Sequence, residues 1–462
     1  MKIPDALMNV LEAIQLAGGS PKLVGGYVRD YVLGLEVGSK DFDIEVSGLS
    51  SETLQMVLKA FGGVNVVGAA FGVYKIYALS ELGCEVDFSI PRLDNKTGAG
   101  HKDFKVVCDP NLPLAERCKR RDLTMNSMEM DPFTGAIEDP FDGLKDLRHG
   151  RMKATDPLTF GDDDLRAVRV AQFVSRFPSM VPDDQLLELC SKADLSNLPG
   201  ERLWEEFKKM LVKGSRPDLG LEFLERAGLL KFFPEVAALA GCQQHPVFHA
   251  EGDVLVHTKM VLKVAASLRS GDAKDDLVLM LSSLCHDLGK PPTTRFDHTK
   301  GRYVSNDHDN AGVAPTQSFL KRLMAPKWVV DDVSTLVQVH LRPFELVKQN
   351  AGASAYRRLA RKMNGVSLDL LVKLATADGE GRICYEGGKQ TREDLKLFLT
   401  RAAEAGVKNV TEPVADVVKG SHLLERGMKP GPEVGEVLKK CREYYDATGE
   451  TDPNKILDEV LK

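Results

Sequence analysis

The sequence predicts a multidomain α+β protein, in which a small mixed sheet with helices is followed by domains built from helices alone. With 462 residues, the chain exceeds the size at which one hydrophobic core usually stops growing. Short apolar runs between glycine-rich turns occupy roughly the first third of the chain and predict strands. From about Leu165 onward, apolar residues recur at the i, i+3, i+4 spacing of amphipathic helices.

The individual apolar runs locate the expected elements. Strands are predicted at residues 23–24, 41–46, 73–78 and 86–90. Helices are predicted around residues 186–189, 203–211 and 221–230. Residues 93–120 are polar, rich in Gly, Asp and Lys, and show no clear period, so we expect a loose loop there. Loops of that length are uncommon in compact domains and are often functional.

Composition and charge restrict the class of protein without identifying it. The net charge of −6 gives no overall sign of nucleic-acid binding, so charge alone favours a small-molecule enzyme, and RNA contacts require local basic patches. The eight cysteines are scattered, which indicates reduced thiols rather than a disulfide framework or a zinc-thiolate site. The N-terminal stretch lacks the pattern of a signal peptide, and no long apolar run predicts a membrane span. We therefore expect a cytoplasmic protein with no membrane partner.

Two glycines and two aspartates predict a phosphate-binding site near the N-terminus. Gly25 and Gly26 follow a short apolar strand and open an expected helix, where backbone amides favour an anion. Asp41 and Asp43 are two residues apart in a predicted strand, so their carboxylates point the same way. This arrangement suits Mg²⁺-dependent phosphoryl transfer. The alternative is a solvated strand edge, which the upstream glycine turn disfavours.

A second polar cluster lies at residues 120–126. Arg121 offers a forked donor to a phosphate or a sugar edge, while Asp122 and Asn126 suit the recognition of hydroxyls. A basic run is usually a solvated face, so this cluster alone does not establish a site.

Histidines are concentrated in the middle of the chain. Seven of the ten lie between His245 and His340, a density that composition does not predict. His257, the adjacent pair His286-Asp287 and Asp378 offer imidazole and carboxylate ligands that suit a divalent transition metal such as Mn²⁺, Ni²⁺ or Zn²⁺. His308 and His340 are candidates for a second metal or a substrate phosphate, and solvated loop histidines are an equally good interpretation.

Four motifs occur in a fixed order in the first 170 residues: Gly25-Gly26-x-Val28-Arg29-Asp30, Asp41-x-Asp43, Arg121-Asp122-x-Thr124-x-Asn126, and Asp163-x-x-Arg166. They resemble the head of class II tRNA nucleotidyltransferases and bacterial poly(A) polymerases, which belong to the polymerase-beta-like nucleotidyltransferase superfamily. The resemblance implies that superfamily's fold for the head, with Mg²⁺ held by Asp41 and Asp43. It implies nucleotide binding by Gly25, Gly26, Arg29, Arg121, Asp122, Asn126, Asp163, Arg166 and Arg169. Asp163 and Arg166 are expected to read the Watson–Crick edges of CTP and ATP.

The sequence departs from this family pattern at two positions. Gln172 stands where arginine is common, and Ser127 stands where alanine usually follows the asparagine. Neither departure removes a catalytic carboxylate, so both concern fine specificity rather than the reaction. Residues 201–206 match the Glu-Arg-x-x-x-Glu opening of the family's neck helix. Glu201 and Glu205 share a face of that helix, and we expect them to support the base-reading helix structurally.

The histidine-rich region resembles a second family. The arrangement of His257, His286-Asp287 and Asp378, with Gly289-Lys290 after the pair, is similar to the HD phosphohydrolase domain of bacterial tRNA nucleotidyltransferases. That resemblance implies phosphatase, 2′-nucleotidase or 2′,3′-cyclic phosphodiesterase activity. The segment around Lys429 is similar to the family's C-terminal region and would contact an RNA backbone, with a plain helical hairpin as the alternative.

Together these features predict a template-independent enzyme that adds CCA to the 3′ end of tRNA from CTP and ATP, with an accessory metal-dependent phosphohydrolase activity. The expected domains are a nucleotidyltransferase head (1–150), a neck (151–235), an HD-like domain (236–410) and a tRNA-binding tail (411–462). The rivals are a poly(A) polymerase, an enzyme that adds only CC or only A, and a phosphohydrolase whose head merely binds RNA. The sequence leaves open which metal fills the HD site, which tRNAs are served, and whether the protein is a monomer or a homodimer.

Overall fold

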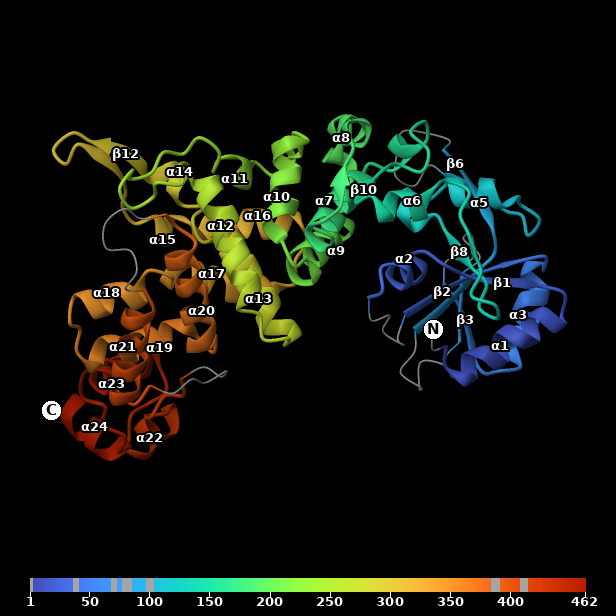
Figure 1. The fold of residues 1–462 in the computed structure, drawn as a ribbon. Coiled ribbons are helices and arrows are strands. Elements are labelled where there is room, and N and C mark those ends of the chain that lie inside the picture. Colours follow the sequence, from blue (N-terminus) through green and yellow to red (C-terminus); the bar gives the residue numbers. More distant parts are fainter. Residues whose placement is uncertain are drawn as a thin grey trace. The chain divides into compact units, whose positions relative to one another are not determined.

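A computed structural model of the chain describes residues 3–35, 41–67, 73–76, 85–96, 104–383, 391–407 and 414–462 (Figure 1). The chain forms two compact units. The first unit comprises residues 1–170 and 177–199, and the second comprises residues 171–176 and 200–462. The boundary between the units therefore falls within helix α7 (Leu165–Arg176). The four-domain division stays a prediction.

A seven-stranded mixed sheet forms the centre of the first unit, with the order β3-β4-β5-β2-β1-β8-β9. Its strands are β1 (Ser20–Val24), β2 (Asp41–Ser47), β3 (Val64–Val67), β4 (Val73–Ile76), β5 (Glu85–Ser89), β8 (Glu129–Met130) and β9 (Ile137–Glu138). Strand β2 pairs in parallel with β5 and antiparallel with β1. Helices α1 (Asp5–Leu16) and α3 (Ser51–Lys59) pack against each other and against this sheet, and α2 (Gly26–Val32) contacts β1 and β2 (Figure 1). The predicted small mixed sheet with helices is confirmed.

The alternation of side chains along β2 places the candidate catalytic residues. Phe42, Ile44 and Val46 are fully buried and face the core. Because successive side chains in a strand point to opposite faces, the residues between them belong to the other face. Asp43 lies on that face and is exposed. Burial of the apolar side chains of β2 thus directs its acidic side chains to the opposite face of the sheet.

The expected loose loop at residues 93–120 is wrong for the part of it that the structure describes. Strands β6 (Arg92–Lys96) and β7 (Phe104–Cys108) form an antiparallel pair, and α5 (Leu114–Lys119) follows. Residues 97–103 lie outside the described chain. Helix α5 buries only Cys118 and is held by ion pairs of Arg117 and of Arg120, which directly follows the helix, so it has no apolar period that the sequence could reveal.

The second unit is helical, as predicted. Its helices before the histidine-rich region are α9 (Gly200–Lys208), which continues as a π-helical turn (Lys209–Lys213), α10 (Pro217–Arg226) and α11 (Pro234–Ala237). They are followed by α12 (Val254–Ser267), α13 (Ala273–Cys285), α14 (Lys290–Thr293), α15 (His308–Ala311), α16 (Val313–Arg322), α17 (Lys327–Val339), α18 (Arg342–Lys348), α19 (Ala353–Met363), α20 (Leu368–Glu380) and α21 (Thr391–Glu404). A hairpin of β12 (Thr294–Asp297) and β13 (Arg302–Ser305) lies between α14 and α15.

The first unit contains further elements besides those of the sheet. They are α6 (Gly143–Arg148), α8 (Asp184–Ser191) and the short parallel pair β10 (Arg151–Met152) and β11 (Val181–Pro182).

Helix α13 is the centre of the histidine-rich region. Every residue from Asp276 to Cys285 is buried, and α12, α17 and α20 pack against this helix. Side-chain caps fix where the helices begin: Asp253 accepts a hydrogen bond from Val256 N (2.9 Å) at the start of α12. Ser367 accepts one from Leu370 N (3.2 Å) at the start of α20. These four helices carry most of the predicted metal ligands at or near their ends.

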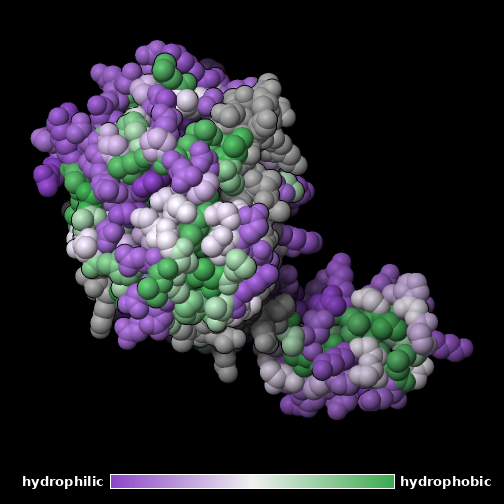
Figure 2. Space-filling view, turned by 90° about the vertical axis from the view of Figure 1, so that its right-hand side faces the viewer, coloured by the Kyte–Doolittle hydropathy of each residue, from purple (hydrophilic) through white to green (hydrophobic). Residues whose placement is uncertain are grey.

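Hydrophobic residues on the face drawn in Figure 2 occur in small groups between hydrophilic ones. Among the described residues, no helix is both long enough and apolar enough to cross a membrane. The cysteines that the structure describes are free thiols: Cys108, Cys118, Cys190, Cys242, Cys285 and Cys441.

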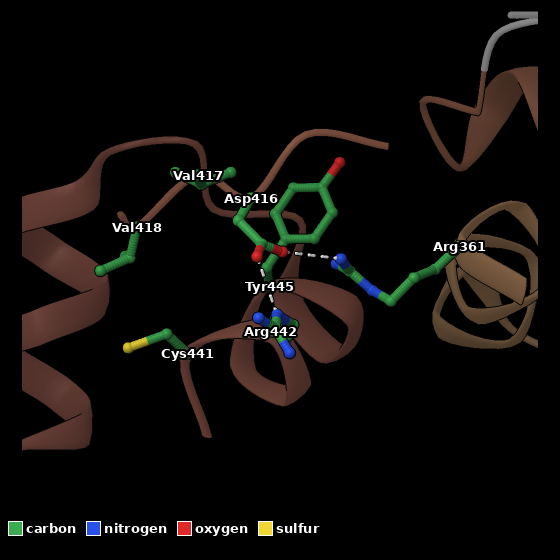
Figure 3. A pocket seen from close by; sticks show the side chains of 7 residues that line it. All are labelled: Arg361, Asp416, Val417, Val418, Cys441, Arg442 and Tyr445. Atoms are coloured by element: carbon green, nitrogen blue, oxygen red, sulfur yellow. Dashed lines mark hydrogen bonds and ion pairs between the residues drawn. The ribbon is translucent and has the colours of Figure 1, made fainter. Parts of the chain in front are cut away.

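The last three helices, α22 (Gly420–Glu425), α23 (Pro432–Thr448) and α24 (Pro453–Val460), have a small core of their own. Charged side chains tie this tail to α19. Arg361 donates to Asp416 and to Asp446, at 3.0 Å in each case, and Arg442 donates to the other oxygen of Asp416 at 2.9 Å. Figure 3 shows Asp416 between the two arginines, beside the ring of Tyr445.

Candidate functional site

The head brings three of the predicted groups to one place. Gly25 has a φ of 69°, a conformation that favours glycine, and it lies directly before α2. A Cβ added at Gly25 would lie 3.5 Å from Asp43 Oδ2 and 3.5 Å from Arg121 Nη1. The glycine turn, the strand carboxylate and the arginine therefore converge. Asp41 begins the same strand, but its side chain lies outside what the structure describes.

Asp87 is a third carboxylate at this place, and it was not predicted from the sequence. Asp87 on β5 is the direct register partner of Asp43. Neighbouring strands lie about 4.8 Å apart and paired residues point to the same face, so the two side chains are adjacent. Asp87 also pairs with Lys75 on β4, at 3.0 Å. No spacing in the sequence links residues 43 and 87; only the parallel register does.

Four of the predicted nucleotide-binding residues form one hydrogen-bonded chain. Asp122 is buried and accepts from Arg169 Nε (2.7 Å), Asn126 Nδ2 (2.9 Å) and Leu123 N (2.8 Å). Arg29 Nη1 in turn donates to Asn126 Oδ1 at 2.8 Å. Burial alone would raise the pKa of Asp122, but the charge of Arg169 and these hydrogen bonds lower it to about 2. Asp122 is therefore an ionised carboxylate whose acceptors are occupied by the protein.

Arg29 has an interior position. It is 3% exposed, donates to Asp30 Oδ1 (2.7 Å) as well as to Asn126, and lies 4.8 Å over the ring of Phe177. These contacts make it a positioning residue for Asn126. Its predicted direct contact with a nucleotide stays a prediction.

Two buried glutamates, also missed in the sequence, anchor the arginines at residues 117–121. Glu129 accepts hydrogen bonds from Nε (2.9 Å) and Nη2 (2.7 Å) of Arg117, and Glu45 accepts one from Arg120 Nη2 (2.8 Å). Burial opposes ionisation of Glu45, yet the charges of Arg121, Arg120 and Arg117 lower its pKa below the usual value. A signal was present, because Glu45 follows Asp43 by two residues and belongs to the same face of β2.

The predicted base-reading pair lies at the start of α7. Asp163 Oδ1 accepts from Leu165 N at 3.2 Å. Arg166 donates to the carbonyl oxygens of Thr159 (2.7 Å) and Arg120 (2.6 Å). Both side chains are half-buried, and these bonds fix the guanidinium beside the arginine segment.

Ser127, one of the two departures from the family pattern, has a structural explanation. Its buried hydroxyl donates to Leu123 O at 2.9 Å and lies 2.6 Å from the hydroxyl of Thr155. Gln172, the other departure, is buried, and its Nε2 has no hydrogen-bond partner within the described chain. Nothing in the structure explains the glutamine.

In the second unit, the four predicted metal ligands lie together and are buried. His257 Nε2 is 3.1 Å from Asp378 Oδ1 and 3.3 Å from His286 Nε2. Asp287 Oδ2 is 3.2 Å from His286 Nε2 and 3.7 Å from His257 Nε2. Such proximity of acceptor atoms is unfavourable unless a cation or protons lie between them.

His308 and His340 join the same group. One candidate metal-binding set is His257, His286 and Asp378, and a second is Asp287, His308 and His340, each with ligand atoms within 4.8 Å of one another. We call these six residues the His–Asp cluster. The solvated-loop interpretation is wrong for His340, which is 1% exposed at the end of α17.

The backbone orients the imidazoles from behind. Nδ1 of His286, His308 and His340 lies within 2.9 Å of the carbonyl oxygens of Ser283, Ser305 and Val337 respectively. A carbonyl only accepts, so each Nδ1 carries the proton and each Nε2 offers a lone pair to the cluster.

His340 shows that the cluster fits a metal ion. Its Nε2 is buried and has no hydrogen-bond partner among the described residues, and burial lowers its pKa to about 4, so the ring is neutral. A buried lone pair without a donor is costly. Imidazole with carboxylate is the donor set that Mn²⁺, Ni²⁺ and Zn²⁺ prefer. The residues present therefore fit a divalent transition metal.

Two further residues hold the cluster in place. Glu251 Oε1 is 3.1 Å from His257 Nδ1 and 2.8 Å from His249 Nδ1, and its other oxygen accepts from Ile383 N (2.9 Å). Lys290 Nζ is 2.7 Å from Asp287 Oδ2. Burial disfavours the charge of Asp287, but His286 and Lys290 hold the pKa of that carboxyl well below its usual range.

Known protein families match both parts of the chain. Residues 22–153 match the Poly A polymerase head domain, residues 188–239 match the probable RNA and SrmB-binding site of polymerase A, and residues 254–375 match the HD domain. The Multifunctional CCA protein of Pasteurella multocida is 31% identical over 405 residues, which cover 84% of this chain and 91% of the relative. The Multifunctional CCA protein of Xanthomonas campestris pv. campestris is 32% identical, over 91% of this chain and 96% of the relative.

Solved structures share the fold along the whole chain. The Bacillus stearothermophilus CCA-adding enzyme in complex with CTP aligns with a TM-score of 0.65 at 21% identity, covering 100% of this chain and 98% of that one. The Thermotoga maritima CCA-adding enzyme complexed with tRNA aligns with a TM-score of 0.58 at 19% identity, covering 100% and 96%.

Substitution of Gly289 by alanine is expected to disturb the His–Asp cluster without removing a ligand. A Cβ at Gly289 would overlap with the carbonyl oxygen of His308 and the backbone of Gly312, so α15 must shift and carry His308 with it. We expect Mn²⁺ to bind G289A about tenfold or more weakly, measured by isothermal titration calorimetry. Gly352→Ala is the matched control, because Gly352 also precedes a helix with negative φ and a Cβ there meets nothing within 4 Å. Equal affinity of G289A and wild type would contradict the role given to His308.

Asp122→Asn is expected to destabilise the head in a pH-dependent way. The carboxyl has a pKa of about 2 in the fold and 3.8 ordinarily, so its charge stabilises the fold above pH 4 by about 2 kcal/mol. That contribution disappears as pH falls from about 4 to 2, because the folded carboxylate then becomes protonated. Urea unfolding followed by circular dichroism should give a higher free energy of unfolding for wild type than for D122N at pH 7. This difference in free energy should disappear at low pH. A difference that does not change with pH would assign the effect to shape rather than charge.

Proposed function

The chain belongs to the family of multifunctional CCA proteins, class II CCA-adding enzymes with an HD domain, and on that premise we propose that it adds CCA to tRNA 3′ ends from CTP and ATP in the cytoplasm. The observation that carries the proposal is the convergence of Gly25, Asp43 and Arg121 in the head. The names of the relatives support it, as do the CTP and the tRNA in the complexes of similar fold.

The reaction is an in-line displacement at phosphorus. The oxygen of the RNA 3′-hydroxyl forms a bond to the α-phosphorus, the bond from that phosphorus to the bridging oxygen breaks, and pyrophosphate leaves. The hydroxyl proton passes to solvent. Mg²⁺ held by Asp41 and Asp43, when bound, supplies charge stabilisation to the triphosphate and activates the hydroxyl.

The residues of the head have separate tasks in this proposal. The Gly25-Gly26 turn lets the backbone approach the triphosphate. Arg121 binds a phosphate oxygen; its Nε is buried without a hydrogen-bond partner among the described residues, so the guanidinium keeps a donor available. Asp122 positions Asn126 and Arg169 on the ribose side through its hydrogen bonds. Asp163 and Arg166 read the base edge.

We further propose that the His–Asp cluster hydrolyses phosphoesters of nucleosides, as a phosphatase, 2′-nucleotidase or 2′,3′-cyclic phosphodiesterase. The buried, unpartnered Nε2 of His340 supports a metal-loaded cluster. In such a hydrolysis, the oxygen of water bonds to phosphorus, the bond to one ribose oxygen breaks, and that oxygen takes the proton. A transition metal such as Ni²⁺ or Mn²⁺, when bound, lowers the pKa of the attacking water.

Nucleotide addition should require the strand carboxylates. Radiolabelled tRNA transcripts lacking CCA, lacking only the final A, or complete are incubated with each nucleotide and Mg²⁺. Wild type should complete the first two and leave the third unchanged, and Asp41→Ala/Asp43→Ala should lose about a thousandfold or more of the rate. Asp5→Ala, in the exposed first turn of α1, is the matched control. Long A tails, or addition of only C or only A, would favour the rival specificities, and no addition at all would make the head a binding module.

Hydrolysis should depend on the His–Asp cluster and not on the head. His286→Ala/Asp287→Ala is expected to lose metal, measured by plasma mass spectrometry, and to lose hydrolysis of adenosine 2′,3′-cyclic phosphate. The same variant should still complete tRNA. Hydrolysis that survives this double substitution would place the activity elsewhere.

A further inference from the structure

An aromatic and basic surface adjoins the His–Asp cluster and has no part in the roles given above. The segment 244–249 borders the cluster at both ends. Gln244 Oε1 accepts from Lys290 Nζ (2.7 Å), the lysine beside Asp287. At the other end, the ring of His249 lies 4.8 Å from that of His257. The solvent-exposed side chains of this segment therefore lie close to the metal ligands.

Phe248 is the exposed aromatic residue of this segment. Its side chain is 42% exposed, although the next residue, His249, is held by Glu251. The ring of Phe248 lies 4.6 Å from the ring of His245, so two flat side chains stand together at the surface. A base stacks readily on such rings, and stacking does not depend on which base it is.

Arg302 adds an unbalanced positive charge. It comes from β13 in the hairpin that extends beyond α14 (Figure 1), and its Nη1 is 3.0 Å from His245 Nε2. Val247 N donates to the other ring nitrogen, Nδ1 (3.1 Å), and a neutral imidazole has only one acceptor nitrogen, so the two donors compete for the ring. With either donor, the neutral ring does not compensate the charge of the guanidinium.

The remaining surroundings do not compensate the guanidinium. Among the residues that the structure describes, Arg302 Nε is buried without a hydrogen-bond partner and Arg302 forms no ion pair with a carboxylate. A guanidinium in this situation is suited to bind a phosphate.

We propose that Phe248, His245 and Arg302 form a substrate subsite of the His–Asp cluster, which selects phosphoesters that carry a nucleobase. The base stacks on Phe248 and His245, and Arg302 binds phosphate oxygen. The inference rests on the proposed hydrolysis of nucleoside phosphates and adds the residues that recognise the base and the phosphate, in a free nucleotide or at the end of an RNA.

Two substrates separate base recognition from phosphate recognition in the full-length protein. Adenosine 2′,3′-cyclic phosphate carries a base, and glycerol 1,2-cyclic phosphate does not. Phe248→Leu should raise KM about tenfold for the adenosine ester, with kcat and the metal content unchanged, and should leave the glycerol ester unaffected. Arg302→Gln should raise KM for both esters. A short RNA ending in the same cyclic phosphate shows whether the RNA end is hydrolysed with a higher kcat/KM than the free nucleotide.

Matched controls exist for both variants. Trp328→Leu alters an aromatic of similar exposure (41%) in the first turn of α17, about 18 Å along that helix from His340. Arg295→Gln alters an exposed arginine of the neighbouring strand β12. Neither should change KM. The inference is overturned if F248L changes both esters equally or neither, or if the controls act as the variants do.

A second measurement does not depend on turnover. Photolabelling with 8-azidoadenosine 2′-monophosphate, followed by peptide mass spectrometry, should modify the peptides that contain Phe248 or Arg302 in wild type and much less in F248L. Label confined to residues 1–199 would overturn the subsite. If wild type hydrolyses neither ester but is labelled at Phe248, the hydrolase proposal fails while the nucleotide subsite stands.

Discussion

The buried carboxylate of Asp122 is the interaction on which the nucleotide side of the head depends. It joins Arg169 of α7 to Asn126, and Asn126 in turn holds Arg29 of α2. A buried charge is tolerated only when donors surround it, so the loss of one donor weakens the position of the others. Elements distant in the sequence are thereby fixed to one another by a single ionised group. The glycine turn before α2 and the base-reading residues at the start of α7 share this support.

The His–Asp cluster uses buried polar groups in the opposite way. Asp122 has its acceptors filled by protein donors, whereas the imidazoles of His286, His308 and His340 are held from behind and leave Nε2 directed at a common region. The first arrangement stabilises a conformation, and the second supplies ligands. The difference lies in which atoms remain without partners, and it distinguishes positioning residues from candidate ligands even though both sets are buried.

The sequence predicted those features that depend on local periodicity or on motif order. The two-residue period of β2 placed Asp41 and Asp43 on the same face of the strand, and the order of the histidines predicted that distant residues would meet. It could not predict the partnership of Asp43 with Asp87, which requires the parallel register of β2 and β5. Helix α5 was missed because buried Glu45 and Glu129 hold it, rather than an apolar face. Likewise, nothing local in the sequence indicates that His340 is buried.

The two centres differ in donor chemistry, and this difference has a consequence for metal selection. The head offers carboxylate oxygens on a strand, with no histidine within the register pairs of β2 and β5. Hard oxygen ligands suit Mg²⁺, whereas a set of imidazoles with carboxylates suits transition metals. A chain that carried the same ligands at both places would expose each reaction to the other's ion. Because the ligands differ, the ions that the donors of the two proposed centres favour differ as well.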